Sequence, residues 1–549
     1  MMFTPQLPVF LNVPAVGTDN ASSITNWISE YTLNYQKSFK KHNITALGGY
    51  TAQKEKGRSN SLTSNKYPNN LVPTLSAVSG QITGGTSDEY EWSLVSFLAR
   101  LNYNYDNKYY FTTSIRADGS SRFGTDNKYA YFPSLAFAWR AKEEKFLKDV
   151  NFLSDLKLRV SYGKSGNNNI GNYESYATIS YENYVFGNGA NGGFAQQKLE
   201  NPVLTWEKQE QINLGIDIAF FNSRLRLSVD HFRSTNTNLL LNVNIPGTTG
   251  FSNSLQNIGE VSNKGWEFVL GTVNTTGKFG WTTDFNLSSY TNRVVKLGPT
   301  GDPIYTANNI TMIGQPIGMF YGLQRNGTFK TQEELNNGPI WNPGAADRSR
   351  VGDMRFVDVS GPNGKPDGII SSADYTIIGS PYPDFYYGMT NRFTYDNFVL
   401  TIGLQGTQGV NIYNLSRGQG NSGRGRLRGY AFNNDYWKSE QSPGDGQTQR
   451  PNNAPTGGAR AIGSQFLDDG SFLRINNIIL SYALPDKISQ RVSLNAVRFY
   501  INATNPFLFT KYTAFNPDVS LNENPLTPGN EQNNYPLAKS IVFGLSVGF

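Results

Sequence analysis

The last nine residues of the chain alternate without interruption between apolar side chains and side chains that are mostly small or polar. The two alternating sets are Ile541, Phe543, Leu545, Val547 and Phe549, and Val542, Gly544, Ser546 and Gly548. A β-strand places successive side chains on opposite faces. The segment is therefore predicted to be a strand with one apolar face, which a water-soluble sandwich and a membrane-spanning barrel would both contain.

The same alternation recurs along the whole chain. It is found at 95–105, 156–162, 212–220, 225–229, 398–404 and 497–503. The second face of these segments carries Arg, Lys, Asp and Asn in mid-strand, which suits the outer surface of a sandwich or the lumen of a transmembrane barrel. The pattern predicts an all-β protein and leaves these two architectures open.

The amino-acid composition excludes several other classes of protein. Charged residues make up 16% of the chain, against about 25% in typical soluble domains, and no apolar run approaches the roughly 18 residues of a membrane helix. Cys is absent and His occurs only at His42 and His231, which excludes disulfides, thiolate metal sites and His-rich metal sites. The net charge of +6 is spread along the chain without a basic block, so no nucleic-acid partner is predicted.

The lengths of the connections discriminate between sandwich and barrel. Short turns are expected at 40–42, 106–108, 222–223, 277–278 and 396–397, and long polar segments at 57–88, 119–129, 167–206, 237–263, 295–384, 415–470 and 512–537. Short and long connections alternate almost strictly. This asymmetry is typical of outer-membrane barrels, which have short periplasmic turns and long extracellular loops.

On this basis we expect fifteen spanning strands, of which the last runs toward the periplasm. They are placed near 27–39, 42–56, 89–107, 109–121, 130–141, 155–166, 207–221, 224–236, 264–274, 279–294, 385–397, 398–414, 471–485, 496–511 and 538–549. Single-chain bacterial barrels have an even number of strands, and large plugged transporters have about 22. The predicted fold is an antiparallel transmembrane β-barrel of the outer-membrane type, of which 27–549 is a C-terminal part. Residues 1–26 are expected to be a remaining extracellular loop, and 295–384 a long extracellular excursion.

A series of motifs goes beyond periodicity. They include Trp206-Glu207-Lys208-Gln209, Asn257-Ile258-Gly259-Glu260, Lys264-Gly265-Trp266-Glu267, Ile313-Gly314-Gln315-Pro316, Phe472-Leu473-Arg474-Ile475-Asn476-Asn477 and Asn502-Ala503-Thr504-Asn505. Any one of them is a weak signal, but their order and spacing together are specific. From about residue 27 to Phe549 the chain closely resembles the C-terminal barrel of the SusC/RagA family of TonB-linked outer-membrane proteins.

The resemblance implies a location in the cell outer membrane of a Gram-negative bacterium of the Bacteroidetes type. It implies active import of a bulky nutrient, usually a glycan oligomer and in some members a peptide. It also implies two protein partners, TonB, which pulls on an N-terminal plug, and a SusD-like surface lipoprotein, which closes over the barrel and binds substrate with it. We find no signal peptide, TonB box or plug in this sequence, and we expect the isolated 549-residue chain not to transport.

An Asp-rich segment at 358–374 resembles the EF-hand-like loop that is common in this family. The predicted Ca²⁺ ligands are Asp358, Asn363, Asp367 and Asp374. An EF-hand loop needs oxygen ligands at positions 1, 3, 5 and 12 and a glycine at position 6. Counting back from Asp374, position 3 is Lys365, which cannot bind a cation. A turn without metal is therefore the alternative interpretation.

Aromatic residues of the long connections are candidates for stacking on substrate. They are Tyr181, Tyr184, Trp341 and Trp437, and packing between loops is an equally good interpretation of all four. No catalytic residue is predicted, because adjacent carboxylates such as Asp468 and Asp469 have no predicted cleft between them. The alternative functions are a passive porin or surface adhesin and, less favoured, a soluble all-β carbohydrate-active protein.

Overall fold

The structure is a computed structural model. It describes residues 2–4, 15–65, 67, 70–72, 74–77, 82–187, 189–245, 247–251, 253–341, 348–361, 363–415, 435–451, 462–492, 494–518, 524–532 and 534–548. The chain divides into two compact units. Unit 1 comprises Met1–Trp139, Val160–Ile212 and Asn236–Gly259, and unit 2 comprises Arg140–Arg159, Asn213–Thr235 and Glu260–Phe549.

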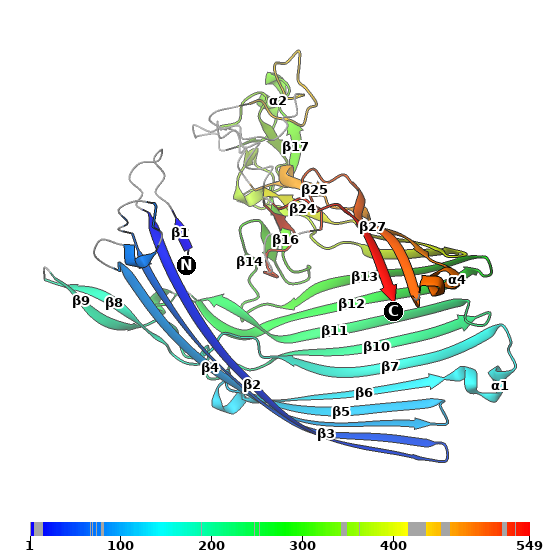
Figure 1. Ribbon diagram of the computed structural model, residues 1–549. Helices are drawn as coiled ribbons and strands as arrows, with labels where there is room; N and C mark the ends of the chain where they lie inside the picture. Colours follow the sequence, from blue (N-terminus) through cyan, green and yellow to red (C-terminus); the bar gives the residue numbers. More distant parts are fainter. Residues whose placement is uncertain are drawn as a thin grey trace. The chain divides into compact units, whose positions relative to one another are not determined.

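Antiparallel strands, most of them long, dominate both units (Figure 1). They are β1 (Met2–Thr4), β2 (Val16–Phe39), β3 (His42–Ser64), β4 (Gly84–Tyr105), β5 (Tyr109–Ser120), β6 (Tyr129–Arg140), β7 (Leu153–Asn167), β10 (Glu207–Phe220), β11 (Leu225–Asn244), β12 (Asn253–Thr275), β13 (Phe279–Lys296), β22 (Phe385–Tyr395), β23 (Phe398–Gln408), β26 (Phe472–Ala483), β27 (Ala496–Thr510) and β29 (Ser540–Gly548). In one sheet they follow each other in sequence order. The predicted antiparallel β architecture is confirmed.

The register of the last strands explains why the alternation predicted them well. In the ladder between β27 and β29, Phe543 is opposite Ile501 and Leu545 is opposite Phe499. Both strands therefore present their apolar residues on the same face, and a slip by one residue would turn every one of them to the other face. The closing residue Phe549 lies outside the described residues.

Several strands extend beyond their predicted bounds. The strand β2 begins at Val16 and pairs with β3 as far as Gly17 opposite Ser64. Residues 16–26 are thus part of a strand, and the expectation of a loop over 1–26 was wrong for them. These strand ends carry polar residues on both faces, so side-chain alternation gave no signal, while the backbone hydrogen bonds of the ladder continue.

The expected strand at 398–414 is in fact two elements. The strand β23 ends at Gln408, and Gly409 has a φ of +77°, a value that favours glycine. The chain then continues as β24 (Asn411–Asn414), which pairs with β25 (Leu467–Asp469) and β28 (Asn530–Glu531) in a separate small sheet. A backbone turn that the alternation does not reveal accounts for this error.

The short turns have the expected chemistry. Asp106 and Asn107 between β4 and β5 have φ values of 54° and 53°, Asp396 between β22 and β23 has 47°, and Gly277 between β12 and β13 has 107°. Asn, Asp and Gly tolerate positive φ, and tight hairpins need it. The turn residues therefore close these hairpins at one end of the strands, which leaves the long connections at the other end.

The long connections of unit 2 contain folded elements of their own. They include strands β14 (Ile304–Tyr305), β15 (Asn309–Thr311), β16 (Met319–Gly322), β17 (Arg325–Thr328), β18 (Ile340–Trp341), β19 (Met354–Phe356), β20 (Ile369–Ile370) and β21 (Thr376–Gly379), and helix α2 (Gln332–Asn337). Helix α1 (Lys145–Lys148) lies in the connection between β6 and β7, and helix α4 (Asp486–Ser489) lies in the connection between β26 and β27. In the described part of the chain, no helix is long and apolar enough to cross a membrane.

Buried amides join these connections in unit 2. The Asn530 side chain donates to Asn309 Oδ1 at 2.7 Å and accepts from Asn308 Nδ2 at 3.2 Å, and Asn309 Nδ2 donates to the Gly318 carbonyl at 2.7 Å. Asn309 is 1% exposed and Asn530 4%. We call Asn308, Asn309 and Asn530 the amide network. It ties together residues more than 200 positions apart, and two small apolar clusters around Phe320 and Phe356 lie in the same unit.

Candidate functional site

Unit 1 contains a small apolar core beside the long connections of β5, β7 and β11. It consists of Phe123, Ala130, Phe132, Ile170, Leu204 and Trp206. The Trp206 ring lies 5.2 Å from Phe123 and 5.5 Å from Phe132, and its Nε1 donates to the Lys128 carbonyl at 3.0 Å. Burial of these aromatic rings, with the polar atom of Trp206 paired, fixes the connections that border the site.

Two further residues of the sequence motifs hold the same region together. Asn257 accepts the Thr205 N–H at 2.9 Å and donates to the carbonyls of Thr205 at 2.8 Å and Asn238 at 2.9 Å. Glu207 accepts the Leu240 N–H at 2.9 Å and the Asn167 amide at 2.8 Å. The residues of the motifs around Trp206 and Asn257 therefore have a structural role. They hold β10, β11 and β12 together at the ends from which the long connections start.

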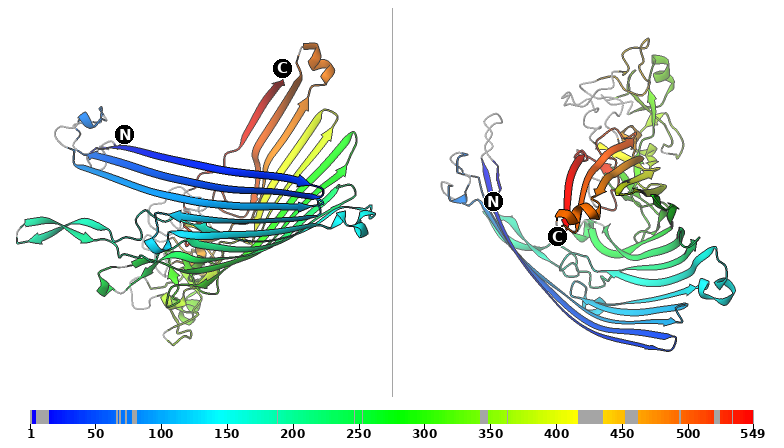
Figure 2. Two further views of the ribbon diagram at one scale, coloured as in Figure 1. Left: turned by 90° about the horizontal axis from the view of Figure 1, so that it is seen from below. Right: turned by 45° about the vertical axis from the view of Figure 1, so that its right-hand side comes forward.

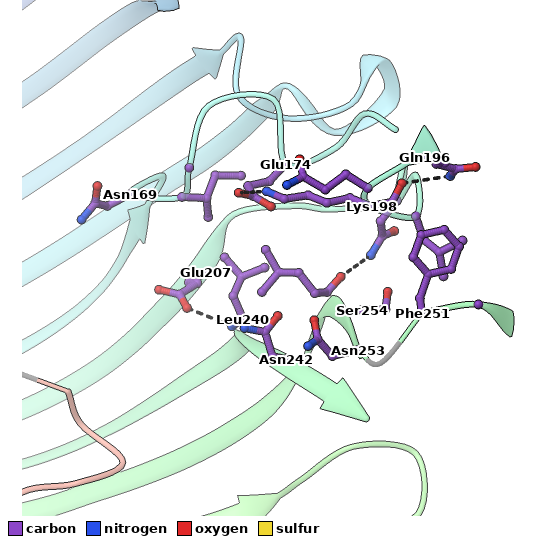
Figure 3. A pocket seen from close by; sticks show the side chains of 17 residues that line it. Asn169, Glu174, Gln196, Lys198, Glu207, Leu240, Asn242, Phe251, Asn253 and Ser254 are labelled. Atoms are coloured by element: carbon purple, nitrogen blue, oxygen red, sulfur yellow. Dashed lines mark hydrogen bonds and ion pairs between the residues drawn. The ribbon is translucent and has the colours of Figure 1, made fainter. Parts of the chain in front are cut away.

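A polar pocket of about 680 Å³ lies on this framework (Figure 3). We call it the amide pocket. Its lining comes from 169–174, from 196–201, and from the facing ends of β11 and β12 together with the connection between them. All of these residues belong to unit 1. The volume lies within the range of about 300–1,000 Å³ that is usual for small-molecule sites.

Part of the lining is already engaged in protein contacts. Lys198 Nζ lies 2.7 Å from Glu174 Oε1, as the dashed line in Figure 3 marks. Asn201 donates to the Leu255 carbonyl at 2.7 Å, and Gln196 donates to the Lys198 carbonyl at 2.9 Å. These contacts fix the walls of the pocket and neutralise the charge of Lys198.

Other polar groups of the lining remain open. Within the described chain, the side-chain amides of Asn169, Gln197 and Asn242 have no hydrogen-bond partner, and all three residues are exposed. Phe251 adds an aromatic wall. No sequence signal singles out these four residues, because asparagine and glutamine are common in all the long connections and no spacing distinguishes the ones that line the pocket.

Two of the predicted substrate-stacking aromatics lie on a projecting hairpin. Strands β8 (Ile179–Phe186) and β9 (Gly189–Gln196) pair with each other and extend away from β7 and β10 (Figure 2). Tyr181 and Tyr184 are 63% and 65% exposed there. Tyr181 meets Phe194 edge to face at 5.9 Å. Their role in stacking on substrate stays a prediction, and the hairpin leads directly into the residues of the amide pocket at Gln196.

The other two aromatics serve the packing of unit 2. Trp341 packs against the apolar cluster of Leu323, Met354, Phe356 and Ile370. Trp437 Nε1 donates to the Lys330 carbonyl at 2.9 Å, and its ring covers Gly352 so closely that a Cβ there would lie 2.5 Å from it. The two tryptophans therefore pack the connections against each other. They belong to unit 2, whereas the hairpin tyrosines belong to unit 1.

The predicted Ca²⁺ ligands are used mainly for turns of the backbone. Asp374 is fully buried and accepts the N–H groups of Val359 at 2.9 Å, Ser360 at 3.1 Å and Ser371 at 2.8 Å. It also completes a capping box with Ser371 on a short 3₁₀ turn. Both oxygens of this carboxylate are therefore occupied by backbone donors.

The remaining predicted ligands do not converge on a common point with Asp374. Asp367 Oδ1 accepts the Ile369 N–H at 2.9 Å, Asp358 Oδ2 accepts the Gly368 N–H at 2.6 Å, and Asn363 is exposed. Asp358 Oδ1 is buried without a partner in the described structure. No group of three or more His, Cys, Asp or Glu side chains among the described residues could hold a metal ion. Ca²⁺ binding stays a prediction that this geometry does not support.

The close carboxylates of the chain are bound by other side chains. Arg159 contacts Asp217 Oδ2 at 2.8 Å and Asp230 Oδ2 at 2.9 Å across β7, β10 and β11. Of the adjacent pair, Asp468 accepts from Asn414 at 3.0 Å, whereas Asp469 accepts the Ser471 N–H at 2.9 Å. Hydrogen bonding from the Ser471 side chain, together with its backbone N–H, lowers the pKa of Asp469. These carboxylates act as anchors for strands and turns.

Comparison with known proteins agrees with this geometry. Residues 9–379 match the family described as "TonB dependent receptor-like, beta-barrel". The chain belongs to the TonB-dependent receptors, in the SusC/RagA family. Receptors of this type are outer-membrane proteins of Bacteroidetes, and the predicted location in the outer membrane is confirmed.

Individual relatives show how much of a receptor this chain represents. It is 35% identical to TonB-dependent receptor P3 of Formosa agariphila over 96% of this chain and 52% of that protein. It is 33% identical to TonB-dependent receptor SusC of Bacteroides thetaiotaomicron over 83% of this chain and 44% of that protein. The solved RagAB peptide transporter superposes with a TM-score of 0.83 at 25% identity, covering 99% of this chain and 57% of that one. The chain thus spans about half the length of the curated relatives it matches.

Proposed function

We propose that this chain forms barrel strands and extracellular connections of a receptor that imports a bulky oligosaccharide through the outer membrane. Import would be powered through TonB and assisted by a SusD-like surface lipoprotein. Membership of the SusC/RagA family supports the transport role. The observation that favours an oligosaccharide is the amide pocket, whose open groups are uncharged amides beside one aromatic ring.

Peptide import is the second candidate. It is supported by the solved relative that is titled a peptide transporter and superposes on nearly the whole chain. No residue described above favours peptide over glycan, since Lys198, the one cation among the described lining residues of the amide pocket, already pairs with Glu174.

A surface partner is supported by the β8–β9 hairpin. Ile179, Phe186 and Phe194 are 69%, 69% and 75% exposed on its two strands. A two-stranded hairpin alone is marginally stable in water, and these exposed apolar side chains lie on both faces of the hairpin, where a partner protein could bury them. We therefore propose that the lipoprotein contacts this hairpin.

The decisive experiment uses the full-length receptor in its native host. A strain that lacks the gene should lose growth on one class of oligosaccharide as sole carbon source, and complementation should restore it. Deletion of tonB should abolish uptake of the same labelled oligosaccharide. Uptake that persists without TonB would support a passive porin, and growth unchanged on every glycan and peptide would support an adhesin.

A further inference from the structure

We propose that the amide pocket binds an uncharged, hydroxyl-rich unit of the substrate, a neutral saccharide residue, and discriminates against charged glycans and peptides. This inference rests on the proposed function, and it assigns the substrate specificity of the receptor to the amide pocket of unit 1. The residues that carry it are Asn169, Gln197, Asn242 and Phe251.

The open hydrogen-bonding groups suit hydroxyls. A carboxamide presents both donors and an acceptor, and a sugar hydroxyl is likewise both donor and acceptor. Asn169, Gln197 and Asn242 come from three different stretches of chain and line one pocket. In Figure 3, Asn242 lies at the lower side of the lining, whereas Asn169 lies at its left edge. A ligand that reaches both amides would receive hydrogen bonds from different stretches of chain, which fixes its orientation.

The charged groups of the lining are already satisfied within the protein. Lys198 is paired with Glu174 at 2.7 Å, and both oxygens of Glu207 accept hydrogen bonds from the Leu240 N–H and Asn167. Among the described lining residues no other cation is present. A carboxylated or sulfated glycan would therefore lose part of its hydration without gaining a counter-charge, which disfavours its binding. The same argument applies to the charged side chains and termini of peptides.

The apolar core of unit 1 holds the pocket in place. Phe251 supplies an aromatic face, against which the C–H face of a pyranose can pack, while the amides reach its hydroxyls. The pocket rests on Ile170, Leu255 and the core around Trp206. This core and the hydrogen bonds of Asn201 and Glu207 hold the walls of the pocket in place, which lowers the cost of ordering the chain when a ligand binds.

The test measures binding to the purified full-length receptor in detergent. An array of neutral and acidic oligosaccharides, including methyl-esterified and de-esterified oligogalacturonides, and a casein tryptic digest serve as probes. We expect retention of at least one neutral oligosaccharide and at least tenfold weaker binding of its charged counterparts. The triple variant Asn169→Ala, Gln197→Ala, Asn242→Ala should lose at least tenfold in affinity, since several hydrogen bonds disappear at once.

Matched variants separate this proposal from misfolding and from a failure of the proposed function. Asn183→Ala removes an exposed amide of the hairpin that does not line the pocket and should leave binding unchanged. Asn242→Asp keeps the shape and should selectively weaken anionic ligands. If no neutral oligosaccharide is retained, if charged ligands bind as well, or if the triple variant binds normally, the pocket assignment is wrong. TonB-dependent uptake of peptide in the host would then still uphold the transport role.

Discussion

The amide network of unit 2 and the amide pocket of unit 1 use the same residue type, asparagine, in opposite ways. In unit 2 the amide network is buried and its members donate to and accept from each other. In unit 1 the amides of Asn169 and Asn242 are exposed and open in the amide pocket, although Asn257 of the same unit is paired as part of the framework. The contrast indicates that the amide network is a fixed scaffold, whereas the amides of the pocket keep hydrogen-bonding capacity for a ligand.

Burial is the physical reason for the difference. A buried amide must be paired, because an unpaired polar group in the interior costs about 1–3 kcal/mol. Unit 2 shows the same rule at Tyr512, whose hydroxyl donates to Glu531 at 3.0 Å. Burial, reinforced by Glu531, raises the pKa of Tyr512 well above its ordinary value. An exposed amide exchanges water for ligand instead, at little cost to the fold.

The largest loss of stability is expected in the small apolar core of unit 1. Trp206→Ala should open the small core and destabilise its surroundings by about 3–5 kcal/mol, the usual cost of deleting a buried aromatic side chain. Hydrogen exchange of peptides covering 120–132 and 168–206 in the full-length receptor measures this. Phe146→Ala, at a site that is 70% exposed, is the matched control. Unchanged exchange in Trp206→Ala would mean that the pocket does not depend on this core.

The second effect concerns the Asp-rich loop of unit 2. Asp374→Ala removes the acceptor of three backbone N–H groups, and we expect a loss of about 2–4 kcal/mol because a charged buried acceptor disappears. Exchange of peptides from 357–376 is the measurement. Wild-type exchange should be the same in EDTA and in millimolar Ca²⁺. Strong protection by Ca²⁺ would instead establish the predicted metal site.

The third effect tests the two uses of asparagine directly. Asn309→Ala should destabilise the amide network by about 1–3 kcal/mol, since it removes the acceptor of the shortest Asn530 hydrogen bond and the donor to the Gly318 carbonyl. Asn169→Ala in unit 1 should change stability by less than about 0.5 kcal/mol, as usual for surface positions. Proteolysis of the folded receptor under increasing urea compares the two. Equal losses would erase the distinction between the units.

Sequence alone predicted most of the strands, because alternation with a period of two shows which residues share one face of a sheet. The prediction was wrong where a strand or a turn produces no alternation of apolar and polar residues. The first half of β2 is polar on both faces, so its start at Val16 left no pattern. The turn at Gly409 and the separate β24 depend on one backbone angle inside an otherwise continuous alternation.

The site was less predictable than the strands. Trp206 and Asn257 belong to motifs that resemble those of the family. In the structure they hydrogen-bond to backbone carbonyls and hold the connections in place. The spacing of the Asp-rich loop suggested ligands, but Asp374 is used by backbone donors, which side-chain spacing cannot reveal. Asn169, Gln197 and Asn242 converge only after folding. Their grouping depends on connections of different length, which no local pattern records.

The smallest expected effect lies at the ion pair that borders the amide pocket. The side chains of Lys198 and Glu174 are 44% and 22% exposed, and partly exposed pairs contribute about 0–1 kcal/mol because solvent screens them. Lys198→Met should therefore leave exchange of 168–201 nearly unchanged, with Lys208→Met as control. The same variant exposes the Glu174 carboxylate to the pocket, so that anionic ligands bind still more weakly. A loss above about 2 kcal/mol would show that the pair belongs to the scaffold, and unit 1 would then resemble unit 2 more closely than its open amides suggest.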